Sequence, residues 1–202
     1  MKYLWITIYL AFLIWSGINP KDQLTWFLEV APAIIGAAVM AYTYNTFRLT
    51  PLVYILILIH CIILMIGGHY TYAEVPLFDS LKDVFGFTRN NYDKVGHFVQ
   101  GFVPALIARE IILRKDIIQG SIWQSFFIIS FCLGFSAFYE IIEWWVALLS
   151  EVAAEAFLGT QGYAWDTQSD MGWALLGAIT SLFFLSKIHN QQLKNIINKP
   201  PV

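Results

Sequence analysis

The 202-residue chain is poor in charged side chains, which make up only 13% of it. A soluble domain carries about 25% charged residues, so this shortage excludes an ordinary soluble protein. Hydrophobic residues make up 58% of the chain, and they form continuous runs rather than the alternating pattern of an outer-membrane barrel. We therefore expect an all-α integral membrane protein, with a single polytopic transmembrane domain over residues 1–202.

Cysteine is also scarce, and the common motifs of soluble enzymes are missing. The two cysteines, Cys61 and Cys132, lie in apolar runs and have no partner at metal-binding or redox spacing. They are predicted to be small buried residues. The sequence contains no Gly-x-Ser-x-Gly, phosphate-loop or dinucleotide motif and no basic pattern typical of nucleic-acid binding. We expect no nucleic-acid partner.

Long apolar runs, in contrast, are plentiful. A helix needs roughly 17–25 residues to cross a bilayer, and six segments approach or exceed this length. They cover residues 3–18, 24–45, 51–67, 96–113, 121–148 and 169–186. The first is short and follows Lys2, as in a signal peptide, but the sequence "WSGINP" after it is a poor cleavage site. The pattern predicts a bundle of about six transmembrane helices, with the first uncleaved.

A short amphipathic segment separates the third and fourth predicted spans. The sequence "VPLFDSLKDVFGF" places Pro76 at a plausible helix start and spaces its apolar residues as on one helix face. Those apolar residues are Leu77, Phe78, Leu81, Val84 and Phe85. We expect a helix lying on the membrane surface, either as part of a site or as a purely structural lid.

The distribution of basic residues predicts the orientation of the spans, since cytoplasmic loops are rich in Lys and Arg. One side would carry Lys2, Arg48, Arg109, Arg114, Lys115, Lys187, Lys194 and Lys199, and the other only Lys21, Lys82, Arg89 and Lys94. This bias places both termini in the cytoplasm. Most of the carboxylates then fall on the outer side.

Acids and histidines gather at the outer ends of five predicted spans. Three pairs, Asp93 with His97, Glu140 with Glu143, and Asp166 with Asp170, have the spacing of one helix face. The full set of candidate residues is Glu29, His69, Glu74, Asp93, His97, Gln100, Glu140, Glu143, Gln161, Asp166 and Asp170. Ionisable groups at this depth are costly and normally face the bundle interior or a wet cavity. We expect one polar pocket open to the outer, periplasmic face.

Converging carboxylates must be neutralised by protons, basic side chains or a metal ion. Arg89 and Lys94 are the only basic residues nearby in sequence. Histidine combined with carboxylates suits a divalent metal such as zinc, manganese or iron. The expected metal ligands are His69, His97, Asp166 and Asp170. Glu140 or Glu143 would be the catalytic base for a metal-bound water, in a hydrolase or transferase acting on a lipid or lipid-linked head group.

Simpler interpretations remain open. Asp93, Asp166 and Asp170 lie where a helix dipole favours acids, and a histidine at a span boundary is often only hydrogen-bonded. Glu140 and Glu143 resist this explanation because they lie late in their span. The same groups could carry cations or protons in a binder or transporter, although no pair of broken spans marks a transporter. They could also hold helices together in a structural or sensory protein, so the sequence leaves open whether the protein is an enzyme.

Four sequence blocks, in this order, resemble the YjdF family of bacterial inner-membrane proteins. The blocks are "GGHYTYAEVPL", "YDKVGHFVQGFVPALIAREI", "YEIIEWW" and "FLGTQGYAWDTQSDM", and the resemblance covers nearly the whole chain. It implies a multi-pass protein of the inner (cytoplasmic) membrane, and it implies no activity, because the family is uncharacterised. A looser resemblance, over about half the chain, links "DKVGHF", "YEIIEW" and the start of the last span to VanZ-like membrane proteins, which are associated with glycopeptide resistance.

Overall fold

The computed structural model describes residues 2–149 and 163–197. In this part of the chain all regular secondary structure is helical, and there is no strand. Its elements are α1 (Lys2–Gly17), α2 (Gln23–Thr43), α3 (Pro51–Tyr70), the short 3-10 helix η1 (Tyr72–Glu74), α4 (Pro76–Phe85), α5 (Tyr92–Lys115), α6 (Ser121–Leu149) and α8 (Asp166–Ile197). The prediction of an all-α protein is confirmed.

Five of these helices are long and apolar enough to cross a membrane, namely α2, α3, α5, α6 and α8. Helix α1 runs alongside these helices and is also apolar, but it has only 16 residues. The last helix extends further than the sequence indicated, because the amphipathic residues after 186 continue the helix to Ile197. The apolar runs therefore located the spans but underestimated the length of α8.

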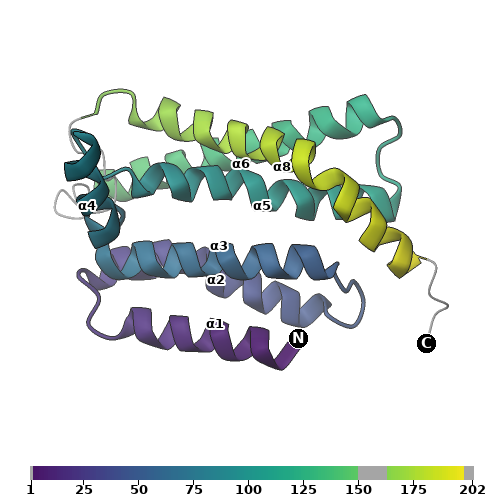
Figure 1. Ribbon diagram of the computed structural model, residues 1–202, viewed down its shortest axis with the longest axis horizontal. Coiled ribbons are helices and arrows are strands. Elements are labelled where there is room, and N and C mark those ends of the chain that lie inside the picture. The colour runs from purple at the N-terminus through teal and green to yellow at the C-terminus, as the bar shows by residue number, and fades with distance from the viewer. Residues whose placement is uncertain (1, 150–162, 198–202) are drawn as a thin grey trace.

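The long helices form two groups of three (Figure 1). In the first group, α1 and α2 both pack on α3, around a core that includes Val30, Val53 and Met65. In the second, α5, α6 and α8 pack on one another around a core that includes Ile128 and Cys132. The contact between α3 and α5 joins the groups. Both cysteines are buried and free, as predicted.

The closest helix contact is between α5 and α8, and glycine makes it possible. A Cβ atom at Gly101 would lie 1.8 Å from the carbonyl oxygen of Ala174, and one at Gly177 would lie 2.0 Å from the carbonyl oxygen of Phe98. Small residues allow helix backbones in a membrane to approach this closely. The contact fixes the register of the two helices, and that register brings the acids of α8 opposite those of α5.

The short helix α4 lies across one end of the bundle, while the start of α1 and the end of α8 lie toward the other end (Figure 1). Pro76 starts α4, and Gly86 ends it in a left-handed conformation with φ 66°. Phe78 packs against the buried residues Tyr72, Val75 and Tyr92. Most other apolar side chains of α4 point outward; Val84, for example, is 76% exposed. We call this end of the molecule the α4 end and the opposite end the terminal end.

Candidate functional site

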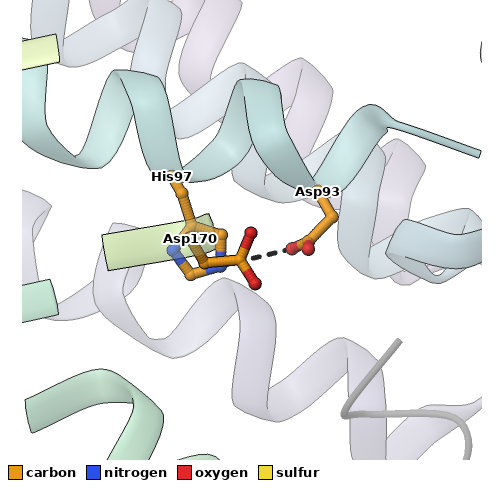
Figure 2. Close-up of side chains that lie close together, drawn as sticks. All are labelled: Asp93, His97 and Asp170. Carbon is orange, nitrogen blue, oxygen red and sulfur yellow. Dashed lines mark ion pairs between the residues drawn. The ribbon is translucent and has the colours of Figure 1, made fainter. Parts of the chain in front are cut away.

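The centre of the candidate site is a buried group of three side chains, Asp93 and His97 on α5 and Asp170 on α8 (Figure 2). One nitrogen or oxygen of each residue lies within 4.8 Å of the others. The Nε2 atom of His97 is 3.3 Å from Oδ1 of Asp93, one helical turn earlier. The Gly101–Ala174 contact explains the arrangement, because it holds the first turns of α5 and α8 side by side.

Helix α6 adds two more carboxylates to this group. The Oε1 atom of Glu140 is 3.7 Å from Nδ1 of His97. Glu143 lies one turn further along the helix, and both glutamates are only 8% exposed. The sequence placed these acids on one face of α6, and the structure directs that face toward α5. Three helices therefore converge on the imidazole ring of His97.

A small cavity lies beside His97 and extends toward α2. Its volume is about 50 Å³, and Glu29, His60, His97, Gln100, Tyr139 and Glu143 are among the residues that line it. This volume has room for a metal ion or a few water molecules but not for a lipid head group. The Tyr139 hydroxyl donates a hydrogen bond of 3.4 Å to Glu29, which connects α6 to α2 across the cavity.

Tyr72, in η1, closes the cavity from the side of α3 and α5. Its ring lies against two glycines: a Cβ atom at Gly67 or Gly96 would come within 2.2 Å or 2.7 Å of it. Burial is the main cause that raises the pKa of Tyr72 well above its ordinary value, and the nearby Glu29 carboxylate adds to this effect. The phenol therefore stays protonated and can donate a hydrogen bond to Glu29.

Arg89 lies between two of the acids. Its guanidinium group pairs with the Asp166 carboxylate and lies 3.5 Å from Oδ2 of Asp93. Its Cζ atom is also 5.6 Å from the centre of the Tyr163 ring. Asp166 is therefore a partner of Arg89 at the edge of the site, whereas the sequence predicted it to be a metal ligand. The reason is that Arg89 precedes α5 and reaches the first residue of α8.

Several buried polar atoms of the site have no hydrogen-bond partner in the part of the chain that the structure describes. They are His97 Nδ1, Gln100 Oε1, Glu140 Oε1 and Asp170 Oδ1. Native proteins satisfy nearly all their buried polar groups. Carboxylate and imidazole atoms suit a divalent metal, so the unsatisfied atoms fit the type of ion that the sequence suggested.

The charges of the site are not balanced by its basic residues. Six carboxyl groups gather here, and the basic groups that pair with them within the described residues are Arg89 and, when protonated, His97. The six belong to Glu29, Asp93, Glu140, Glu143, Asp166 and Asp170. Burying unpaired carboxylates costs several kcal/mol each. Additional protons or a bound cation must therefore neutralise the group.

Two predicted pocket residues lie elsewhere. The Nδ1 atom of His69 is 3.0 Å from the backbone oxygen of Ser16, and its ring is 4.6 Å from that of Trp15, so it contacts α1. Glu74 pairs with Lys21, and both side chains are about half exposed. His69 faces away from His97 because the last turn of α3 packs on the end of α1. Gln161 lies outside the residues that the structure describes.

A second buried polar cluster, which the sequence did not predict, lies at the terminal end. Glu110 of α5 is fully buried, and its carboxylate accepts hydrogen bonds from the backbone and side chain of Thr50. Arg114 lies 2.8 Å and His189 3.1 Å from this carboxylate. Glu110 thereby caps α3 with an acid from another helix. The spacing of Glu110 and Arg114, four residues apart, is typical of an ion pair on one helix face and could have indicated part of this cluster. His189 could not be included, because it lies beyond the predicted end of the last span.

Comparison with known proteins gives two matches. The family described as "Predicted membrane protein (DUF2238)" matches residues 1–191. The protein named "Inner membrane protein YjdF" of Escherichia coli (strain K12) is 50% identical over 182 residues, which cover 90% of this chain and 87% of that protein. No solved structure matches. The matches confirm the resemblance to the YjdF family, whereas the VanZ-like resemblance is not shown.

Proposed function

The chain belongs to the DUF2238 family of predicted membrane proteins, and from the geometry of its buried acids we propose that it binds one divalent cation inside the membrane. The proposed ligands are Asp93, His97 and Asp170. The observation that carries the proposal is the convergence of these three buried side chains within 4.8 Å, beside polar atoms that have no hydrogen-bond partner in the described chain. The cation would serve a hydrolase or transferase acting on a lipid or lipid-linked head group.

The proposed location is the inner membrane, in keeping with the name of the E. coli relative. Helix α1 would be a sixth span, because it lies alongside α3 in the first group. The terminal end would face the cytoplasm, since it carries Lys2, Arg48 and Arg114. The site at the α4 end would then face the periplasm, and α4 would lie at the outer membrane interface with its exposed apolar side chains in lipid.

The ligand chemistry favours zinc, manganese or iron over magnesium or calcium. Imidazole is a good ligand for zinc and iron, and the two carboxylates also suit manganese, whereas magnesium and calcium prefer oxygen alone. A bound metal of this kind lowers the pKa of a coordinated water. Glu143 lines the same cavity as His97 and would be the general base beside such a metal. Glu140, whose Oε1 atom lies 3.7 Å from Nδ1 of His97, is the proposed residue that orients the imidazole.

A lipid-linked substrate is favoured by the side of the bundle on which the cavity opens. Pro32 of α2 and Phe135 of α6 both line it, and Phe135 is 43% exposed. In a membrane-spanning bundle, such a side chain contacts lipid. In the proposed arrangement this wall of the cavity would border the bilayer between α2 and α6, and a reacting group carried by a lipid would approach the site from there.

A second candidate is a cation- or proton-coupled binder or transporter. His60 favours it, because this partly buried residue of α3 lines the deep end of the cavity, away from the α4 end. The excess of carboxyl groups would then be balanced by protons that the protein exchanges. In this case the site holds protons instead of a metal, and purified protein contains no metal in fixed ratio.

Metal analysis of the purified protein tests the proposal. The protein should be purified without chelators and without a metal-affinity step, and its metal content measured by mass spectrometry. We expect about one zinc, manganese or iron per chain, and a large loss of that metal in Asp170→Asn. Glu74→Gln is the matched control, because Glu74 is an acid near the same end that pairs with Lys21 outside the site. Metal-free wild-type protein would support the second candidate instead.

A further inference from the structure

A groove between α1 and α2 opens at the terminal end, far along the bundle from the acidic site. Its volume is about 440 Å³, within the range of about 300–1,000 Å³ typical of ligand pockets. The walls are mainly apolar and include Ile6, Leu10, Ala37 and Met40, and the mouth carries Lys2 and Arg48. Neither the proposed metal chemistry nor the family assignment gives this groove a role.

The groove exists because α1 and α2 each pack on α3 much more than on each other. Two hydrogen bonds tie α1 to its neighbours beneath the groove: Trp5 Nε1 donates to the backbone oxygen of Tyr54 at 2.7 Å, and the Tyr9 hydroxyl donates to that of Ala33 at 3.2 Å. Ala37 is a small residue on the α2 wall, so α2 does not fill the space. The hollow is therefore held open by the packing of its own walls.

Two positive charges converge at the mouth of the groove. Lys2 Nζ lies 4.5 Å and Arg48 Cζ lies 5.3 Å from the centre of the same Tyr44 ring. No salt bridge to a carboxylate is found for either residue within residues 2–149 and 163–197. Two cations beside one ring repel each other, and an anion bound between them would offset that repulsion.

We propose that this groove binds one anionic glycerophospholipid, with an acyl chain against the apolar walls and the phosphate between Lys2 and Arg48. Arginine recognises phosphate well, and basic pockets between transmembrane helices bind acidic head groups. The apolar walls favour a lipid over a free anion, because a free phosphate would leave them uncovered. The site is independent of Asp93, His97 and Asp170, so its test does not depend on the proposed metal.

Native mass spectrometry can test this site directly. The protein should be reconstituted in a membrane of equal parts phosphatidylglycerol and phosphatidylcholine, then released, and its bound lipid identified. We expect one tightly retained phosphatidylglycerol per chain. The double substitution Lys2→Gln with Arg48→Gln should lower the preference for phosphatidylglycerol by about tenfold or more. The control is Lys187→Gln with Lys194→Gln, which removes two charges from α8 that do not line the groove and should leave the preference unchanged.

A second variant separates the acyl chain from the phosphate. Ala37→Trp fills the apolar part of the groove and leaves both charges in place, so it should also abolish lipid retention. Equal retention of the two lipids by the wild-type protein would overturn the proposal. It would equally be overturned if Ala37→Trp retained the lipid while inorganic phosphate displaced it, since the groove would then be only an anion site.

Discussion

Gly101 of α5 lies directly against the backbone of Ala174 of α8, with no room for a side chain between them. Gly101→Val should therefore separate the two helices and lower the free energy of unfolding by about 3 kcal/mol, at the upper end of the usual cost of overpacking. Thermal unfolding in detergent measures this effect. Gly134→Ala is the matched control, because a Cβ at this helical glycine would meet nothing within 4 Å; equal losses in both variants would contradict the close contact.

The Arg89–Asp166 pair should hold the start of α8 against the segment before α5. Arg89→Gln leaves a buried carboxylate without its cation, which costs about 3 kcal/mol of stability. Adding Asp166→Asn removes that carboxylate, so the double variant should be more stable than Arg89→Gln alone. Chemical denaturation in detergent gives the free energies of unfolding of the wild-type protein, Arg89→Gln and the double variant. If Asp166→Asn further destabilised the Arg89→Gln protein, Arg89 would not be the main partner of Asp166.

The buried cluster around Glu110 should contribute to stability without affecting the metal. Glu110→Ala removes the acceptor for Thr50 and His189 together, and the expected loss of stability is about 3 kcal/mol or more. The metal content per folded chain should stay the same, because the cluster lies at the opposite end from His97. Asp116→Asn is the control, since Asp116 is an exposed acid just after α5. A loss of metal in Glu110→Ala would show that the two ends are coupled.

Membrane orientation can be tested with fusions at the carboxyl terminus. The concentration of basic residues at the terminal end predicts that this terminus lies in the cytoplasm. A reporter active only in the cytoplasm should therefore work, and one that requires export should stay inactive. The opposite pattern would place the acidic site on the cytoplasmic side and would contradict its proposed periplasmic location.

Some of the site followed from helical spacing alone. Asp93 with His97, and Glu140 with Glu143, share helix faces by their position in the sequence, and burial cost predicted that these faces meet. The sequence could not give the direction in which the last turn of α3 points, so His69 was expected beside His97 although it contacts Trp15. That direction depends on how α1 packs, which no local pattern records.

For the fold as well, the sequence predicted the individual helices but not how distant helices pair. Continuous apolar runs located the long helices, because each needs enough nonpolar residues to cross the bilayer. The pairing of α5 with α8 depends on Gly101 and Gly177 meeting backbone from a distant segment, and a single glycine within an apolar run does not identify its partner. His189 was missed for a related reason, since a polar helix end resembles a tail until it packs against Glu110.

X-ray absorption spectroscopy of the metal-loaded protein can show whether Asp93, His97 and Asp170 bind the ion, because it detects the atoms coordinated to the metal. For zinc, we expect one histidine nitrogen at about 2.0–2.1 Å and carboxylate oxygens at about 2.0–2.2 Å. In His97→Gln the nitrogen contribution should disappear, while in His69→Gln, which alters a histidine near the same end that contacts α1, it should remain. A spectrum without a histidine shell, or one that His97→Gln leaves unchanged, would contradict a metal held by Asp93, His97 and Asp170.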